Sequence, residues 1–342
     1  AIAATTSLTD FLDQLDEEAW HTSLTELLPA IHEVDRSATL IWFVFFPLRL
    51  RRALQRADDP VQLARQLLLE GQYDLAAQID TAAHFLYGHR YWTEVKRAVL
   101  EHAAGDTVAP ATHLDQKIKE IAKRLAAKLK VEASLLTGIT AVALMSLQQV
   151  GIEAFRAGSG DTANAKPLTK SPEQVLRERA RDDGQGLFGF LRTADKRWTV
   201  TFDERDPGAK FKLINDEEIA SAAARDPRDW RAHDPRRIEG PIPVQCRSAS
   251  CGTCWVGVLG GAEKLSDMSA REIQKLKEFG YLNCSEPKPI IRLACMARAA
   301  GALSIVIPPW NGVFGKYLAE HGGECDAAEA TTDAAEDDSP SQ

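Results

Sequence analysis

The sequence has no excess of positive charge, and this absence excludes a large class of functions. It contains 41 Lys and Arg residues against 49 Asp and Glu residues. Eight of the acids follow Lys316, and no Lys or Arg lies among them. The rest of the chain is therefore neutral, with 41 residues of each sign. Because binding to a phosphate backbone requires a basic surface, we expect no nucleic-acid partner.

A secretory signal and familiar catalytic motifs are also missing. The first 20 residues carry no basic cluster before an apolar run, and they become acidic by Asp10. We therefore expect a cytoplasmic protein, and we leave open a membrane-associated position on the cytoplasmic side. Since no flavin, nicotinamide or other active-site motif is recognisable, we do not expect the chain to be catalytic alone.

Long apolar runs are few, and two segments raise the question of membrane contact. An aromatic run from Trp42 to Phe46 precedes a basic cluster that begins at Arg49. This pattern is typical of interfacial or partner-binding segments, but the run is far shorter than the ~20 residues that span a bilayer. Residues 133–152 are uncharged but rich in Ser, Thr, Gln and Gly, too polar for a transmembrane prediction. We favour burial for both segments and keep peripheral membrane contact as the alternative.

Helical periodicity is present from about residue 7 to about residue 157. Apolar residues recur at helical spacing, and a long helix is predicted to start near Asp115. We expect residues 1–157 to form an all-α domain for docking or oligomerisation, and it resembles no family that we can name. Three histidines share no helix face, so we expect core or surface roles, and no metal site, for His84, His89 and His102.

Composition divides the rest of the chain. Residues 158–195 are rich in Gly, Ser and Pro without apolar periodicity, which indicates a linker. Within it, Gly184–Gly189 matches GxGxxG, but the preceding RERARDDG is no buried strand, so we reject a dinucleotide site. Residues 319–342 are Ala-rich and acidic, and we predict a disordered tail there.

Residues 196–318 read as short strands and helices. RWTVTFD and KFKLIN flank the turn DPGA and predict a β-hairpin. A helix is predicted after Asn215, a strand at WVGVLGG, and a second helix that begins near Ser266 or Asp267 and ends at Gly280. Two more strands are predicted in IIRLACMARAAGALSIVIPP. This order indicates a small mixed sheet over one helix, so we assign the whole chain to the α+β class.

Six cysteines are present, and three of them lie close together in CRSASCGTC. Cys246, Cys251 and Cys254 are separated by four residues and then by two. In a cytoplasmic protein, clustered thiols indicate metal or redox chemistry more than structural disulfides. Zinc and iron–sulfur clusters both take four thiolates, although zinc usually takes two C-x2-C pairs and this segment has one. The fourth ligand is either Cys295, in the strand-like RLAC, or Cys284, in a Pro-flanked loop.

The C-x4-C-x2-C spacing with a distant cysteine in RLAC resembles plant-type [2Fe–2S] ferredoxins, whose domain has the β-grasp fold. The likeness extends from about residue 196 to 310 and is strongest to bacterial members that insert a helix between the third and fourth ligands. It implies that Cys284 is a free thiol, and Ala249 stands where plant-type members often carry Gly. It also implies one-electron transfer and a [2Fe–2S] cofactor whose iron ligands are Cys246, Cys251, Cys254 and Cys295.

The chemistry of the loop agrees with a negatively charged cofactor. Small residues let the loop curl so that backbone N–H groups point at sulfur, and Gly252 can adopt a positive φ. The hydroxyl groups of Ser248, Ser250 and Thr253 are further donors, and Arg247 can offset negative charge.

Three functions are compatible with these observations. We favour an electron-transfer subunit that exchanges electrons with redox partner proteins and that its helical domain docks into a larger oxidoreductase complex or a homo-oligomer. The alternative is a cluster-dependent redox-sensing regulator whose helical domain binds a partner. A third function is an unrecognised catalytic site in the helical domain, supplied with electrons by the ferredoxin-like domain.

Overall fold

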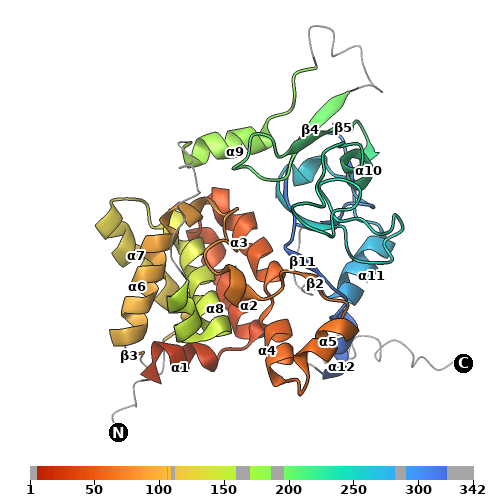
Figure 1. Ribbon diagram of the computed structural model, residues 1–342. Helices are drawn as coiled ribbons and strands as arrows, with labels where there is room; N and C mark the ends of the chain where they lie inside the picture. The colour runs from red at the N-terminus through yellow and green to blue at the C-terminus, as the bar shows by residue number, and fades with distance from the viewer. Residues whose placement is uncertain are drawn as a thin grey trace, which may run out of the picture.

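The computed structural model describes residues 6–105, 107–108, 112–158, 170–185, 196–281 and 290–321. The described residues form a helical half, up to residue 158, and a sheet half, from residue 196 (Figure 1). The prediction of an α+β fold is confirmed. Some predicted features lie outside the described residues, namely Cys284, residues 322–342 of the predicted tail and most of Gly184–Gly189.

The helices of the helical half gather around one apolar helix. They are α1 (Leu8–Asp13), α2 (Glu17–Leu27), α3 (Glu33–Phe45), α4 (Leu48–Arg56), α5 (Pro60–Gln66), α6 (Trp92–Gly105), α7 (Leu114–Leu129) and α8 (Ser134–Ala157). The central helix α8 packs against α1, α3, α6 and α7. Because α8 carries no charge over most of its length, it has no face that requires solvent and can be covered on all sides.

The single long helix predicted from near Asp115 is wrong, because the structure has two helices there. Helix α7 ends at Leu129, and Lys130 adopts a left-handed conformation with φ 58°. Helix α8 begins four residues later, at Ser134. Left-handed positions usually carry Gly or Asn. Position 130 is Lys, and the apolar pattern continues across it. The break between the two helices is therefore not marked by any residue typical of a helix end.

The two segments considered for membrane contact lie largely inside the protein. Helix α8 is the one described helix with the length and composition to cross a membrane, and 78% of its apolar window is buried. The core helix of a bundle has the same composition, so this is weak evidence for a span. In the aromatic run, Trp42 and Phe45 are fully buried and Phe46 is 3% exposed. These side chains are therefore part of the core.

The sheet half contains a five-stranded mixed sheet in the order β5-β4-β10-β7-β8. Its strands are β4 (Arg197–Thr201), β5 (Lys210–Ile214), β7 (Trp255–Gly260), β8 (Ile291–Leu293) and β10 (Leu303–Val306). Strand β10 runs parallel to β4, and the other neighbouring strands are antiparallel. The predicted hairpin is confirmed, since β4 pairs with β5 and the buried residues Trp198 and Leu213 face each other.

Two helices of the sheet half begin later than predicted. The helix expected after Asn215 is α10 (Ile219–Ala223). It is delayed because Asp216 has φ 61° and the next two residues form β6 (Glu217–Glu218), which pairs with β9 (Arg298–Ala299). Helix α11 (Ala270–Phe279) is capped by the side chain of Ser269 in place of the predicted residues. Its end is as predicted, at Gly280 with φ 84°.

Part of the predicted linker is helical. Helix α9 (Pro172–Ala180) begins with a capping box in which Ser171 and Gln174 satisfy each other's backbone N–H groups. At its end, the buried Arg179 donates to the carbonyl oxygen of Val34 at 2.6 Å and binds Glu204 at 2.6 Å. This helix is therefore fastened to both halves.

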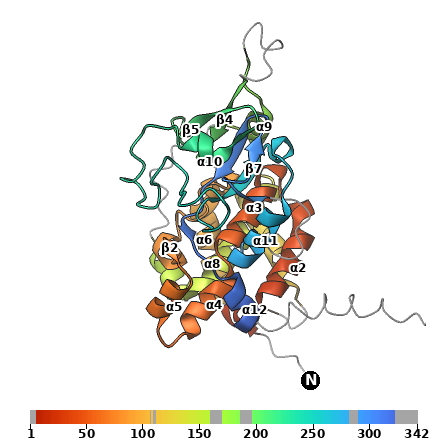
Figure 2. The same cartoon turned by 90° about the vertical axis from the view of Figure 1, so that its right-hand side faces the viewer.

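The two halves share one hydrophobic core. Helix α3 lies against β7 (Figure 2). There, the ring of Phe45 meets Trp255 edge-on at 5.1 Å. A second junction is the antiparallel pair of β2 (Glu70–Gly71) with β11 (Trp310–Asn311), which is followed by α12 (Gly315–His321). The indole nitrogen of Trp310 also donates to the carbonyl oxygen of Phe45 at 2.6 Å.

Candidate metal centre

The cysteine loop, residues 246–254, curls through two left-handed residues. Ala249 has φ 56° and Gly252 has φ 70°. The bend lets the backbone N–H of Ser250 donate to the sulfur of Cys246 at 3.3 Å. Ala249 adopts this conformation although it is not glycine, a strain typical of functional loops. The loop therefore curls with N–H groups toward sulfur, as its small residues predict.

Strand pairing brings the third cysteine of the loop to Cys295. Cys254 directly precedes β7, and Cys295 follows β8 after one residue. These strands are antiparallel neighbours, with Trp255 opposite Leu293. Past the end of the pair, the N–H of Ala294 donates to the carbonyl oxygen of Cys254 at 2.9 Å. Two cysteines that are 41 positions apart in the sequence therefore lie side by side.

The four thiols are arranged as two pairs. The side chains of Cys246 and Cys251 are within hydrogen-bonding reach of each other. The side chains of Cys254 and Cys295 form the second such pair. The pairs are also close enough to interact electrostatically, Cys251 with Cys254 and Cys246 with Cys295. The structure thus brings together all four cysteines that the sequence singled out.

The two pairs differ in exposure. Cys254 is 1% and Cys295 2% exposed, whereas Cys246 and Cys251 are partly exposed. Burial raises the pKa of the Cys246 thiol, but hydrogen bonds from Ser250 and Ser248 outweigh burial and lower the pKa to about 6. The contact with Cys254, together with the N–H of Ala249, holds the pKa of Cys295 below its usual value. Both effects favour thiolate, the form that binds iron, at Cys246 and Cys295. Burial raises the pKa of Cys251, and the contact with Cys295 together with burial raises the pKa of Cys254.

A buried ion pair holds the strand that leads to Cys295. Glu272 of α11 and Arg292 of β8 make two parallel bonds of 2.9 and 3.0 Å, with both side chains 1% exposed. The same carboxylate accepts the N–H of Leu293 at 2.9 Å. The pair therefore joins the inserted helix to the backbone two residues before the fourth cysteine. Neither residue was singled out in the sequence, because charged residues on a helix and in a strand are ordinarily solvated.

Tyr281 contacts the cysteine loop from its buried side, and it was not singled out in the sequence either. Its hydroxyl group lies 3.1 Å from the carbonyl oxygen of Gly252 and 2.7 Å from that of Gly312. Its ring stacks on Trp255, with centroids 3.8 Å apart. Burial raises the pKa of Tyr281 far above its usual range, so the hydroxyl group stays a donor.

The donor set fits a two-iron cluster better than a single metal ion. Each iron of a [2Fe–2S] cluster takes two thiolates, so two pairs of thiols match it. A zinc ion would need its thiolates around one point. Among the described residues, no group of three or more His, Cys, Asp or Glu side chains is placed so that it could hold one metal ion. The thiols, the N–H donors and the small loop residues therefore suit iron and sulfide.

Comparison with known families agrees with this geometry. Residues 223–300 match the family described as the 2Fe-2S iron-sulfur cluster binding domain. The matched segment contains Cys246, Cys251, Cys254 and Cys295. No solved structure matches the chain. The predicted resemblance is confirmed for the sheet half, which binds a [2Fe–2S] cluster.

Proposed function

We propose that this chain transfers single electrons as a subunit of a larger oxidoreductase. The observation that carries the proposal is the arrangement of four thiols in two pairs within a [2Fe–2S] binding domain. Cys246 and Cys251 would hold one iron, and Cys254 and Cys295 would hold the other. When bound, the cluster accepts and releases one electron at a time.

The residues around the thiols direct the electron to one side of the protein. Trp255, Phe279 and Tyr281 bury the inner side of the site, where each is at most 1% exposed. On the outer side Arg247, Ser248 and Ser250 are exposed. Because electron transfer is fastest over the shortest distance, redox partner proteins would dock at the outer loop.

Positive charge next to the outer loop supports its role. Arg271 of α11 donates from Nε at 3.1 Å and from Nη2 at 2.8 Å to the carbonyl oxygen of Ser248. Arg247 lies in the loop and binds Glu239 at 2.6 Å. The two bonds from Arg271 hold the loop in one conformation, and its guanidinium group adds positive charge beside the loop, whereas the charge of Arg247 is paired with Glu239.

The helical half supports assembly through its surface and not through its aromatic run. Trp42, Phe45 and Phe46 are buried in the core that the halves share. Docking to the larger complex would therefore use exposed apolar residues, of which Val61 and Leu68 are 60% and 61% exposed. A cytoplasmic location is part of this proposal.

Spectroscopy of cysteine variants tests the proposal. The purified protein should be brown and give a rhombic electron paramagnetic resonance signal on reduction. Cys295→Ala should lose this signal, because the inner thiol pair is broken, and Cys284→Ala should keep it. A signal that survives Cys295→Ala and disappears in Cys284→Ala would contradict the ligand set.

A redox-sensing regulator is the second candidate, and one observation favours it. Gln245, the residue before Cys246, binds Glu70 of the helical half at 3.2 Å. A change at the loop can therefore reach the helical half. In this case, the helical half would bind a partner differently in oxidised, reduced and cluster-free protein, and equal binding in all three forms would exclude the regulator.

A further inference from the structure

A short segment of the helical half reaches across to the cysteine loop. This segment, Glu70–Gln72, is called the brace below; it consists of β2 and the residue after it. Gly71 of the brace lies opposite Trp310 of β11, and the N–H of Gln72 donates to the carbonyl oxygen of Pro309 at 2.9 Å. Next to the brace, the N–H of Val313 donates to the carbonyl oxygen of Leu67 at 2.7 Å.

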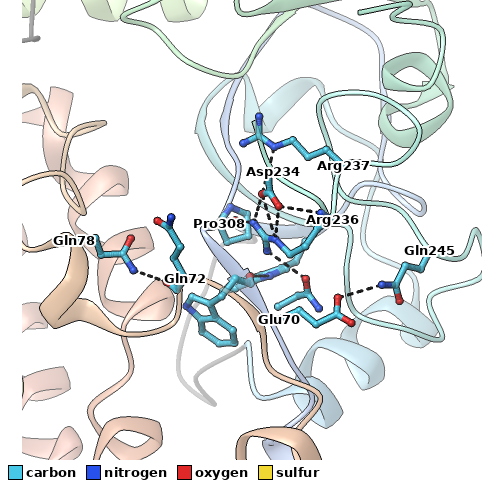
Figure 3. A network of polar contacts seen from close by, with 11 residues as sticks. Glu70, Gln72, Gln78, Asp234, Arg236, Arg237, Gln245 and Pro308 are labelled. Atoms are coloured by element: carbon cyan, nitrogen blue, oxygen red, sulfur yellow. Dashed lines mark hydrogen bonds and ion pairs between the residues drawn. The ribbon is translucent and has the colours of Figure 1, made fainter. Parts of the chain in front are cut away.

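Gly71 is required for this close approach. Its φ is +89°, and a Cβ atom there would overlap the carbonyl oxygen of Pro309 and lie 2.9 Å from the guanidinium of Arg236. Arg236 is 6% exposed and donates to Asn311 at 3.2 Å, to Pro308 at 3.0 Å and to Asp234 at 2.6 Å. Figure 3 shows Asp234, Arg236 and Pro308 beside the brace, with Glu70 and Gln245 pointing toward each other. A polar network around Arg236 therefore lies directly against the brace and fixes the strand β11 with which the brace pairs.

Two routes lead from the brace to the cysteine loop. The first is the exposed bond of 3.2 Å between Glu70 and Gln245, which directly precedes Cys246. The second is buried and runs through β11 to Gly312, whose N–H donates to the hydroxyl oxygen of Tyr281 at 2.9 Å. That hydroxyl group in turn lies 3.1 Å from the carbonyl oxygen of Gly252, between Cys251 and Cys254. Because buried hydrogen bonds contribute more than exposed ones, the second route should dominate.

We infer that the brace positions the cysteine loop, so that retention of the cluster depends on contact between the two halves. This inference rests on the proposed cluster ligands. The coupling must be reciprocal, because a loaded loop that is stabilised by the brace also stabilises the brace. The helical half is then a part of the cluster site and not only a docking module.

Cluster loss to an iron chelator, followed by visible absorbance in the full chain, tests the inference. Tyr281→Phe removes only the hydroxyl group and should speed cluster loss by about fivefold, as expected for one buried hydrogen bond. Glu70→Ala should speed it by less, because that bond is exposed. Tyr91→Phe, a hydroxyl deletion elsewhere in the helical half, should leave the rate unchanged. Phe155→Leu lowers overall stability at a fully buried side chain that packs on Trp92, and it controls for general destabilisation.

Hydrogen exchange distinguishes coupling between the brace and the cluster from a general structural effect of the substitutions. Exchange at the amides of Gln72 and Val313 should be slower in cluster-loaded protein than in stripped protein, and Tyr281→Phe should reduce this difference. Equal cluster loss in Tyr281→Phe, Phe155→Leu and unchanged protein, with equal exchange in both forms, would overturn the inference alone. A chain that takes up no iron and sulfide would overturn both the inference and the proposed function.

Discussion

At the scale of single residues, the ion pair between Glu272 and Arg292 places the fourth cysteine. Both side chains are buried, and the carboxylate also holds the backbone at Leu293. A buried charge that loses its partner is costly, whereas the pair itself contributes mainly to defining one geometry. The pair therefore matters most for where Cys295 lies.

The first prediction concerns this pair. Glu272→Gln leaves the guanidinium group of Arg292 buried without its counter-charge, and we expect the free energy of unfolding to fall by about 3 kcal/mol. Urea unfolding followed by circular dichroism measures the loss. Glu263→Gln, on the exposed side of the same half, is the control and should change it by less than about 0.5 kcal/mol. An unchanged urea midpoint for Glu272→Gln would show that the pair is not buried as described.

The second prediction concerns pH and His89, which is 6% exposed and stacks on Trp92. Burial lowers the pKa of His89 to about 4, although the carbonyl oxygen of Asp80 opposes this. Between pH 6.5 and 4, His89 is protonated in the unfolded chain and neutral in the folded chain. The free energy of unfolding therefore falls as the pH falls. His89→Gln should lose this dependence, worth about 2.5 kcal/mol by pH 4.5.

Asp35 acts in the opposite direction and serves as the internal check. Burial raises the pKa of Asp35 to about 6, so its contribution to stability is lost as the pH rises from 3.8 to 6. This contribution is common to both proteins. The difference in unfolding free energy between wild type and His89→Gln therefore isolates His89, and a difference that is constant from pH 7 to 4.5 would contradict its low pKa.

At the scale of elements, the sequence predicted the sheet half well and the junctions poorly. Alternation in RWTVTFD and Gly280 after α11 are local signals, and local signals survived in the structure. The break after α7 and the late start of α10 occur at Lys130 and Asp216, which adopt left-handed conformations. Because neither residue is glycine, nothing in the local sequence marks these positions. The helix α9 was missed because its capping box lies within a segment of linker composition. Junctions such as β2–β11 join residues about 240 apart, which no local pattern reports.

The third prediction tests the β2–β11 junction. Gly71→Ala places a Cβ against the carbonyl oxygen of Pro309 at a positive φ, and we expect it to lower the free energy of unfolding by about 2 kcal/mol. Gly105→Ala is the matched control, because nothing lies within 4 Å of a Cβ at the end of α6. Thermal unfolding compares the two variants. Equal melting temperatures would mean that β2 and β11 are not paired.

At the scale of the whole molecule, the shared core makes the two halves one cooperative unit. Phe45, from the aromatic run, packs on Trp255 and accepts a hydrogen bond from Trp310. The structure brings together the four cysteines that were singled out in the sequence. The sequence could not show that helix α3, which looks like part of a separate helical domain, completes the core of the sheet half. Contacts between segments that are distant in the sequence depend on the whole fold.

The fourth prediction follows from this shared core. Phe45→Ala should lower the free energy of unfolding by about 3–5 kcal/mol and shift the loss of helix and of cluster absorbance together, since both halves lose the same contact. Val61→Ala, at a side chain that is 60% exposed, should shift neither. Two separate transitions, with only one moved by Phe45→Ala, would indicate independent domains.

The most direct test of the account is the content of iron, acid-labile sulfide and zinc in the purified full-length chain. The two thiol pairs predict about two iron and two sulfide ions per chain and no stoichiometric zinc. One zinc ion per chain without sulfide would contradict the central claim that Cys246, Cys251, Cys254 and Cys295 hold a [2Fe–2S] cluster.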